Sequence, residues 1–120
     1  MRIYKFEEIQ SWQKAKELTL GVYRNFSDNK DYGFKDQIQR ASVSVMNNIA
    51  EGFERQTNKE FIRFLYIAKG SGGEVRSMLY LAKDFKYISN EQFKELYNLS
   101  LDVTKLISGF IKKLNEPSKT

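Results

Sequence analysis

The sequence predicts an all-α protein, an antiparallel up-down-up-down four-helix bundle that assembles into an oligomer. Apolar residues recur at three- and four-residue steps in four segments that span most of the 120 residues. The connections between the second, third and fourth segments are short, which favours antiparallel neighbours. The apolar surface of the third segment is wider than one bundle needs, so we expect a subunit contact. Residues 1–120 are expected to form a single domain.

The first helix is expected over residues 6–26. Its core-facing positions follow helical spacing and are Ile9, Trp12, Ala15, Leu18, Val22 and Phe26. Gly21 lies within this helix at a cost of about 1 kcal/mol relative to Ala, and we expect it to mark a close packing contact. The polar, turn-rich residues 27–33 predict the only long loop.

The second helix is expected over about residues 34–55, with two distinct faces. The apolar face consists of Ile38, Ala41, Val45, Ile49 and Phe53. The opposite, polar stripe consists of Arg40, Ser44, Asn47, Glu51 and Arg55. Small residues, Gly52 among them, should let a neighbouring backbone approach closely. We expect the Asn47-Asn48 pair to make a hydrogen bond between helices or subunits, since Asn is unfavourable inside a helix.

The third helix is expected over about residues 58–85, after a capping box formed by Thr57 and Glu60. Its apolar residues cover a wide arc. Tyr66 and Tyr80 lie off the main apolar seam, so they are our candidates for the oligomer interface.

The segment Gly70-Ser71-Gly72-Gly73 interrupts this third helical pattern. A phosphate-binding loop would follow a strand and end in Gly-Lys-Ser/Thr, and neither feature is present. Each glycine costs a helix about 1 kcal/mol, so close helix packing or a local kink is the favoured explanation.

The fourth helix is expected to begin at a second capping box, formed by Ser89 and Gln92. Its apolar positions form a heptad seam made of Phe93, Leu96, Ser100, Val103, Ile107, Phe110 and Leu114. The only proline, Pro117, follows where helices usually stop.

Composition argues against an enzyme. The chain has no histidine and no cysteine, which removes Cys/His zinc sites, Ser-His and Cys-His nucleophilic pairs and an imidazole base. We therefore expect no catalytic residue, cofactor or metal. Glu51 and Glu74 could suggest a di-metal pair, but such sites also use Glu-x-x-His motifs, so salt bridges to Arg40, Arg55 or Arg63 are favoured.

The expected location is the cytoplasm, without a membrane partner. No apolar run approaches the roughly 20 residues that span a bilayer. The N-terminus does not have the apolar core of a signal peptide, and the absence of cysteine fits a reducing compartment.

The charge balance is compatible with a polyanionic partner. There are 20 Lys and Arg against 15 Asp and Glu, a net charge of +5. We name six candidate nucleic-acid-binding residues. Arg40 lies on the second helix, and Arg55, Lys59 and Arg63 lie around the turn between the second and third helices. Lys112 and Lys113 lie near the C-terminus, with Lys119 beyond them. The alternative explanation is that these charges are solvated and serve solubility.

Two long segments, RASVSVMNNIAEGFER and KEFIRFLYIAKGSGGEV, carry a family resemblance. They resemble the bacterial four-helix bundle proteins encoded by intervening sequences within large-subunit ribosomal RNA genes. The elements that match are Arg40-Ala41, Ser44, Asn48-Ile49-Ala50-Glu51-Gly52, Gly70-Ser71, Glu74 and the earlier Trp12-Gln13-Lys14-Ala15. The sequence departs from the family at Met46-Asn47, where proline and a small residue are frequent, and at Gly72-Gly73, which replace larger residues.

The resemblance implies a homopentamer of four-helix subunits with no known catalytic activity. A similar fold serves as the accessory protein of diversity-generating retroelements, a basic pentamer that binds nucleic acid and a reverse transcriptase. Our first hypothesis is therefore a non-enzymatic, homo-oligomeric protein that binds RNA, or DNA, through basic patches. The alternative is an oligomeric scaffold that binds a protein partner without contacting nucleic acid directly.

Overall fold

Four long α-helices, preceded by a short 3-10 turn, make up the part of the chain that the structure describes. The computed structural model describes residues 2–117, and its elements are η1 (Phe6–Glu8), α1 (Gln10–Phe26), α2 (Tyr32–Phe53), α3 (Asn58–Asp84) and α4 (Asn90–Leu114). No strand occurs within these residues, so the predicted all-α class with four helices is confirmed. None of the described helices is long and apolar enough to cross a membrane.

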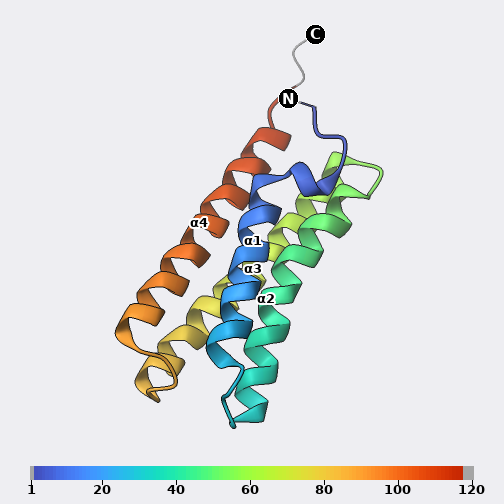
Figure 1. Ribbon diagram of the computed structural model, residues 1–120. Helices are drawn as coiled ribbons and strands as arrows, with labels where there is room; N and C mark the ends of the chain where they lie inside the picture. Colours follow the sequence, from blue (N-terminus) through green and yellow to red (C-terminus); the bar gives the residue numbers. More distant parts are fainter. Residues whose placement is uncertain (1, 118–120) are drawn as a thin grey trace.

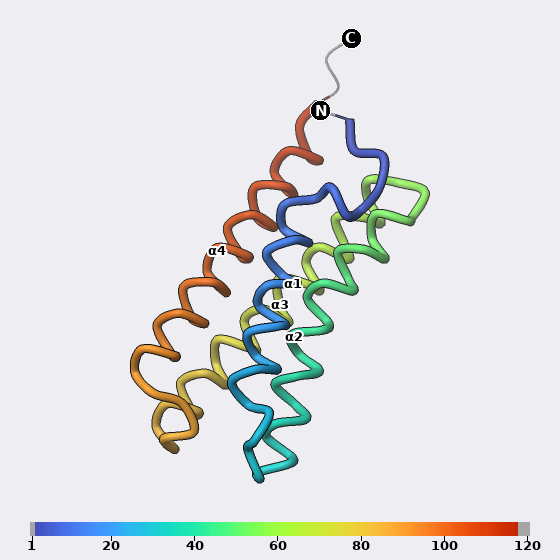
Figure 2. Tube along the Cα trace, in the orientation of Figure 1, coloured from blue at the N-terminus to red at the C-terminus, as the bar shows by residue number. Residues whose placement is uncertain are grey.

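The helices lie side by side in an elongated bundle of 54 × 21 × 19 Å (Figure 1). Successive helices are joined at alternate ends of the long axis, as the trace in Figure 2 shows. The backbones of α1 and α2, α2 and α3, α3 and α4, and α4 and α1 approach closely, whereas those of the α1–α3 and α2–α4 pairs do not. Each helix therefore has two neighbours, and α1 and α3 occupy opposite corners.

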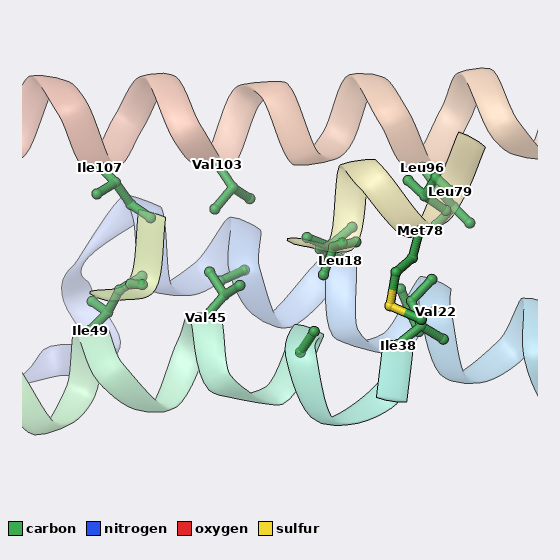
Figure 3. Close-up of a cluster of buried hydrophobic side chains, with 14 of the residues drawn as sticks. Leu18, Val22, Ile38, Val45, Ile49, Met78, Leu79, Leu96, Val103 and Ile107 are labelled. Atoms are coloured by element: carbon green, nitrogen blue, oxygen red, sulfur yellow. The ribbon is translucent and has the colours of Figure 1, made fainter. Parts of the chain in front are cut away.

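The core is apolar and receives side chains from every helix (Figure 3). Leu18, Val45, Leu79, Val103 and Ile107 are fully buried. Burial of each such side chain contributes about 1.5–3 kcal/mol. The predicted apolar seams point to this core, and the seam residues at its margin are only partly buried: Trp12, Phe53, Phe93, Phe110 and Leu114. The Trp12 ring packs edge-on against Phe6.

The first helix begins later than predicted, because the chain breaks at Ile9. Ile9 has an extended backbone (φ −76°, ψ 121°) and a buried side chain. The Glu8 carboxylate accepts hydrogen bonds from the backbone N–H groups of Tyr4 and Lys5, both at 3.2 Å. Ile9 is 2% exposed, so it occupies its predicted core position although the helix starts one residue after it.

The loop after α1 is shorter than predicted. The Asp31 side chain accepts a hydrogen bond from the Phe34 backbone N–H at 3.2 Å, so α2 starts at Tyr32. An Asp at this N-cap position satisfies one of the free N–H groups of the first turn.

The two predicted capping signals both mark helix starts. Ser89 and Gln92 form the full reciprocal capping box of α4. At α3, the Thr57 hydroxyl accepts from the Glu60 backbone N–H at 3.2 Å. Helix α3 then ends with Lys86 in the left-handed region (φ 62°), where the following Tyr87 N–H donates to the Ala82 carbonyl, as in a Schellman motif.

Close packing explains two glycines but not those of the central α3 segment. A Cβ on Gly52 would lie 2.7 Å from the Phe64 Cβ, and one on Gly21 would lie 2.9 Å from a Leu96 methyl, so both expectations of close approach are confirmed. Helix α3 continues through residues 70–73. A Cβ on Gly70 would meet no atom within 4 Å, and one on the buried Gly72 would lie 3.7 Å from Thr104 Oγ1, an ordinary contact, so neither glycine is required there by a tight approach of another helix within the subunit.

Candidate nucleic-acid interface

Five of the six predicted basic residues lie at one end of the bundle. Arg55, Lys59 and Arg63 flank the α2–α3 turn, and Lys112 and Lys113 occupy the last turn of α4. Both segments lie at the end where the chain begins (Figure 1). Arg40 is separate from them, within α2, and Lys119 lies outside the described residues.

Two of these predicted cations already have carboxylate partners. Arg40 Nε lies 2.9 Å from Asp36 Oδ2, and Arg55 Nη2 lies 2.9 Å from Glu51 Oε1. The Arg55 guanidinium also lies 4.7 Å from the centre of the Phe64 ring. The expected pairing of Glu51 with Arg55 is therefore confirmed. Both ion pairs are exposed, where such pairs contribute only about 0.2–1 kcal/mol.

The residues of the family resemblance meet in a polar seam between α2 and α3. The hydroxyls of Ser44 and Ser71 are 2.8 Å apart, and Asn48 Nδ2 donates to Ser44 Oγ at 3.0 Å. Asn48 thus reaches α3 through Ser44 and does not cross between helices directly. A shallow cavity of about 540 Å³ lies beside the seam, lined in part by Arg40, Ser44 and Ser71.

Glu74 also belongs to this polar seam, but it pairs differently from the prediction. Its carboxylate accepts a hydrogen bond from Gln37 Nε2 at 3.2 Å, and it forms no salt bridge with an arginine of the described residues. Arg40 and Arg55 do not pair with Glu74 because each is held by a carboxylate four residues away on its own helix, a local pairing that helix geometry favours.

A second basic surface, absent from the sequence-based candidates apart from Lys112, lies along α3 and α4. We call it the α3–α4 face and define it by five cations and two tyrosines: Lys69, Arg76, Lys83, Lys94, Lys112, Tyr80 and Tyr97. The α3 cations are seven residues apart and the α4 cations eighteen, and both spacings return to the same side of a helix. Arg76 donates to the Thr104 hydroxyl and Lys83 lies 4.6 Å from the Phe93 ring centre, so this side of α3 contacts α4.

The cations of the α3–α4 face have no carboxylate partners. The salt bridges of residues 2–117 are Lys14–Glu17 and the Arg40 and Arg55 pairs already described, and none involves this face. Helical geometry also places Glu95 and Asp102 about 80–100° around α4 from Lys94 and Lys112, away from α3. Glu91 lies three residues before Lys94 and Glu116 four residues after Lys112, but neither forms a salt bridge with that lysine.

Aromatic rings lie at the end of the α3–α4 face that is next to the connection between α3 and α4. Tyr80 lies 5.2 Å from Phe93 and 5.5 Å from Tyr97, and the rings of Phe93 and Tyr97 stack at 5.3 Å. A hydrogen bond with Tyr97 raises the pKa of Tyr80 above its ordinary value. Tyr80 nevertheless remains 48% exposed. Nearly half of Tyr80 is therefore accessible to a partner while its ring contacts Phe93 and Tyr97.

The two predicted interface residues have different surroundings. Tyr80 contacts α4 within its own subunit, as part of this aromatic cluster. Tyr66 is 55% exposed and lies on the outer side of α3 with the exposed Ile67 and Leu81.

Sequence periodicity could have revealed the α3 cations, because Lys69, Arg76 and Lys83 form a strict seven-residue repeat. Within the described chain, no group of three or more acidic side chains gathers closely enough to hold a metal ion.

Comparisons with known proteins extend the resemblance to nearly the whole chain. Residues 7–109 match the family model described as 23S rRNA-intervening sequence protein. A crystal structure from Bacteroides thetaiotaomicron VPI-5482, described as a protein with unknown function from the S23 ribosomal protein family, is similar with a TM-score of 0.80 and 28% identity. The similarity covers 85% of this chain and 98% of that one. No curated protein matches the sequence.

Proposed function

This chain belongs to the family of 23S rRNA-intervening sequence proteins, and from that premise we propose that it is a non-enzymatic, cytoplasmic RNA-binding protein. In this proposal it acts as a homopentamer of antiparallel up-down-up-down subunits. The observation that carries the proposal is the α3–α4 face, whose five cations have no carboxylate partner among residues 2–117. Cations left free in this way can neutralise phosphates without first breaking an ion pair.

Oligomerisation would strengthen a charge that is modest in one subunit. Each chain carries a net +5, so a pentamer carries about +25. Phosphate neutralisation releases condensed counterions, and the resulting affinity falls steeply as salt rises. Several weak basic faces on one ring could therefore hold a long RNA that a single subunit would release.

Two exposed apolar faces support the proposed ring. One lies on α3 and includes Tyr66, Ile67 and Leu81, and the other lies on α1 and includes Leu20 and Tyr23. Because α1 and α3 occupy opposite corners of the bundle, these faces point away from each other. Two different, opposed surfaces suit a heterologous head-to-tail contact, which closes into a ring when the rotation allows it.

The alternative function is an oligomeric scaffold for a protein partner. The observation that favours it is the pairing of Arg40 and Arg55 with their own carboxylates, which leaves these two predicted phosphate contacts already satisfied. In that case the basic residues would serve solubility or an acidic partner.

Binding experiments separate the two functions. Fluorescence anisotropy of the purified protein should be measured with a structured ribosomal RNA fragment, a single-stranded RNA and a duplex DNA over a salt series. We expect binding to RNA that weakens linearly in log Kd with log salt. Absence of binding to all three probes at low salt would contradict the RNA-binding proposal. A protein partner that is recovered from host extracts equally with and without nuclease would then support the scaffold.

A further inference from the structure

We propose that the α3–α4 face binds single-stranded RNA, with an unpaired base stacked on Tyr80 and the flanking phosphates on the surrounding cations. This inference rests on the proposed RNA-binding function and deepens it by naming the surface and the kind of RNA. Its two components are a row of free cations and an exposed aromatic ring, and neither belongs to the residues predicted from sequence to contact nucleic acid, Lys112 excepted.

The cations are arranged as a track along the bundle. Lys69, Arg76 and Lys83 rise by about 10.5 Å per step along one side of α3, at 1.5 Å per residue. Lys94 and Lys112 lie on α4, about 27 Å apart along its axis by the same measure. The two rows run beside each other because α3 and α4 are in contact. A flexible strand that follows this seam would have positive charge on both sides.

Tyr80 lies within the track, between Arg76 and Lys83 in the sequence, and is supported from behind. Phe93 and Tyr97 contact its ring, with ring centres 5.2 and 5.5 Å from that of Tyr80. The ring is therefore ordered before a ligand arrives, yet almost half of the residue is exposed. Pre-ordering lowers the entropy lost on binding, and stacking on an aromatic ring tolerates any base.

Stacking on Tyr80 distinguishes single strands from duplexes. In a duplex the faces of the bases are covered by their neighbours, so a duplex can use the cations but not the aromatic ring. An unpaired strand can use both. Tyr66 lies fourteen residues before Tyr80, so the two share one side of α3 and are about 21 Å apart along its axis. Ile67 and Leu81, the other exposed apolar residues of the outer face, lie farther around the helix from Tyr80.

The first test replaces the aromatic ring and measures anisotropy with a 20-nucleotide unstructured RNA and with the same RNA annealed to its complement. Tyr80→Leu should weaken binding of the single strand about tenfold, the effect of one lost base stack. It should change duplex binding less than twofold. Tyr80→Phe keeps the ring and should bind the single strand within about twofold of wild type. Circular dichroism checks that both variants keep their helices.

The second test compares two double variants that each remove two positive charges, one from the α3–α4 face and one from the ion-paired arginines of α2. Lys69→Gln with Lys83→Gln should weaken single-strand binding and reduce the slope of log Kd against log salt by about 1.4, from about 0.7 for each lost phosphate contact. Arg40→Gln with Arg55→Gln removes the same charge from residues that are already ion-paired, and should leave that slope nearly unchanged. A larger effect from the Arg pair would overturn the proposed location.

A third measurement needs no variant. Photo-crosslinking of the wild-type protein to single-stranded RNA that contains 4-thiouridine should give adducts on residues 69–97, identified by mass spectrometry. Adducts confined to residues 40–63 would contradict the inference.

If wild type binds no nucleic acid, the proposed function itself fails. If it binds RNA with the same affinity after Tyr80→Leu and Lys69→Gln with Lys83→Gln, the function stands and only this inference fails.

Discussion

Tyr87 joins the two connecting segments at the end of the bundle opposite the chain's beginning. Its hydroxyl donates to Asp31 Oδ2 at 2.7 Å, and its ring lies 5.4 Å from Phe34 in an edge-on arrangement. The hydrogen bond from Tyr87, followed by that from the Phe34 backbone N–H, lowers the pKa of Asp31 below its ordinary 3.8. The same bond to Asp31 raises the pKa of Tyr87 above 10.0.

These shifts predict a pH-dependent effect of Tyr87→Phe. A lowered Asp31 pKa contributes stability that is present above pH 3.8 and is lost as pH falls through the folded-state pKa. A raised Tyr87 pKa contributes stability that is present below pH 10.0 and is lost as pH rises through its folded-state value. We therefore expect Tyr87→Phe to be less stable than wild type at pH 5–9, with the difference shrinking in stronger acid and base.

Urea unfolding followed by circular dichroism between pH 2 and pH 11 measures this difference. Tyr32→Phe, at an exposed tyrosine next to Asp31, is the matched control and should show no such profile. A stability loss for Tyr87→Phe that is the same at every pH would mean that ring packing alone, without the hydrogen bond, accounts for Tyr87.

At the scale of helices, Gly52 sets how closely α2 approaches α3. Besides the Phe64 Cβ at 2.7 Å, a Cβ at this position would meet the Phe61 ring at 2.9 Å. The Phe64 Cβ is attached to the backbone and cannot move away without shifting α3. Gly109 in α4 offers the opposite case, since nothing lies within 4 Å of a Cβ there.

Alanine substitutions at these two glycines should therefore have opposite effects. Gly52→Ala is expected to lower the free energy of unfolding by about 1–3 kcal/mol, because overpacking outweighs the better helix propensity of alanine. Gly109→Ala should raise it by about 1 kcal/mol, since only propensity changes. Urea unfolding of both variants measures the two changes. A stabilised Gly52→Ala variant would show that α2 and α3 can separate at little cost.

At the scale of the whole molecule, the proposed ring would bring together the exposed apolar faces of α1 and α3. Tyr66 is the better test of that step than Tyr80, because Tyr80 also contacts Phe93 and Tyr97 in its own subunit. A charge at Tyr80 would disturb the α3–α4 contact as well as any interface. Tyr66 forms no such ring contact and is more than half exposed.

We predict that Tyr66→Glu shifts the mass measured by light scattering from about five subunits towards one, because it places a charge on an apolar contact. Helical circular dichroism should remain largely intact. Tyr4→Glu adds the same charge at an exposed tyrosine outside both apolar faces and should leave assembly unchanged. A wild-type protein that stays monomeric at micromolar concentration would contradict the ring, and loss of helicity together with assembly would show that Tyr66 supports the bundle itself.

The sequence by itself determined the four helices and most of the core. Helical hydrogen bonds and caps join residues three or four positions apart, so signals such as Ser89 with Gln92 could be recognised without tertiary structure. The seams that include Leu18, Val45 and Val103 were likewise predictable, because an amphipathic helix must bury its apolar side.

The tertiary structure alone decided which polar groups are occupied and which are free. The bond between Gln37 and Glu74 and the tyrosine cluster around Tyr80 both depend on how separate helices pack. Charge counting treats Arg40 and Lys69 alike, yet Arg40 is held by Asp36 while Lys69 has no carboxylate within 4 Å in the described chain. A basic surface depends on distances between side chains, which a list of residues does not contain, and the α3–α4 face therefore emerged only from the fold.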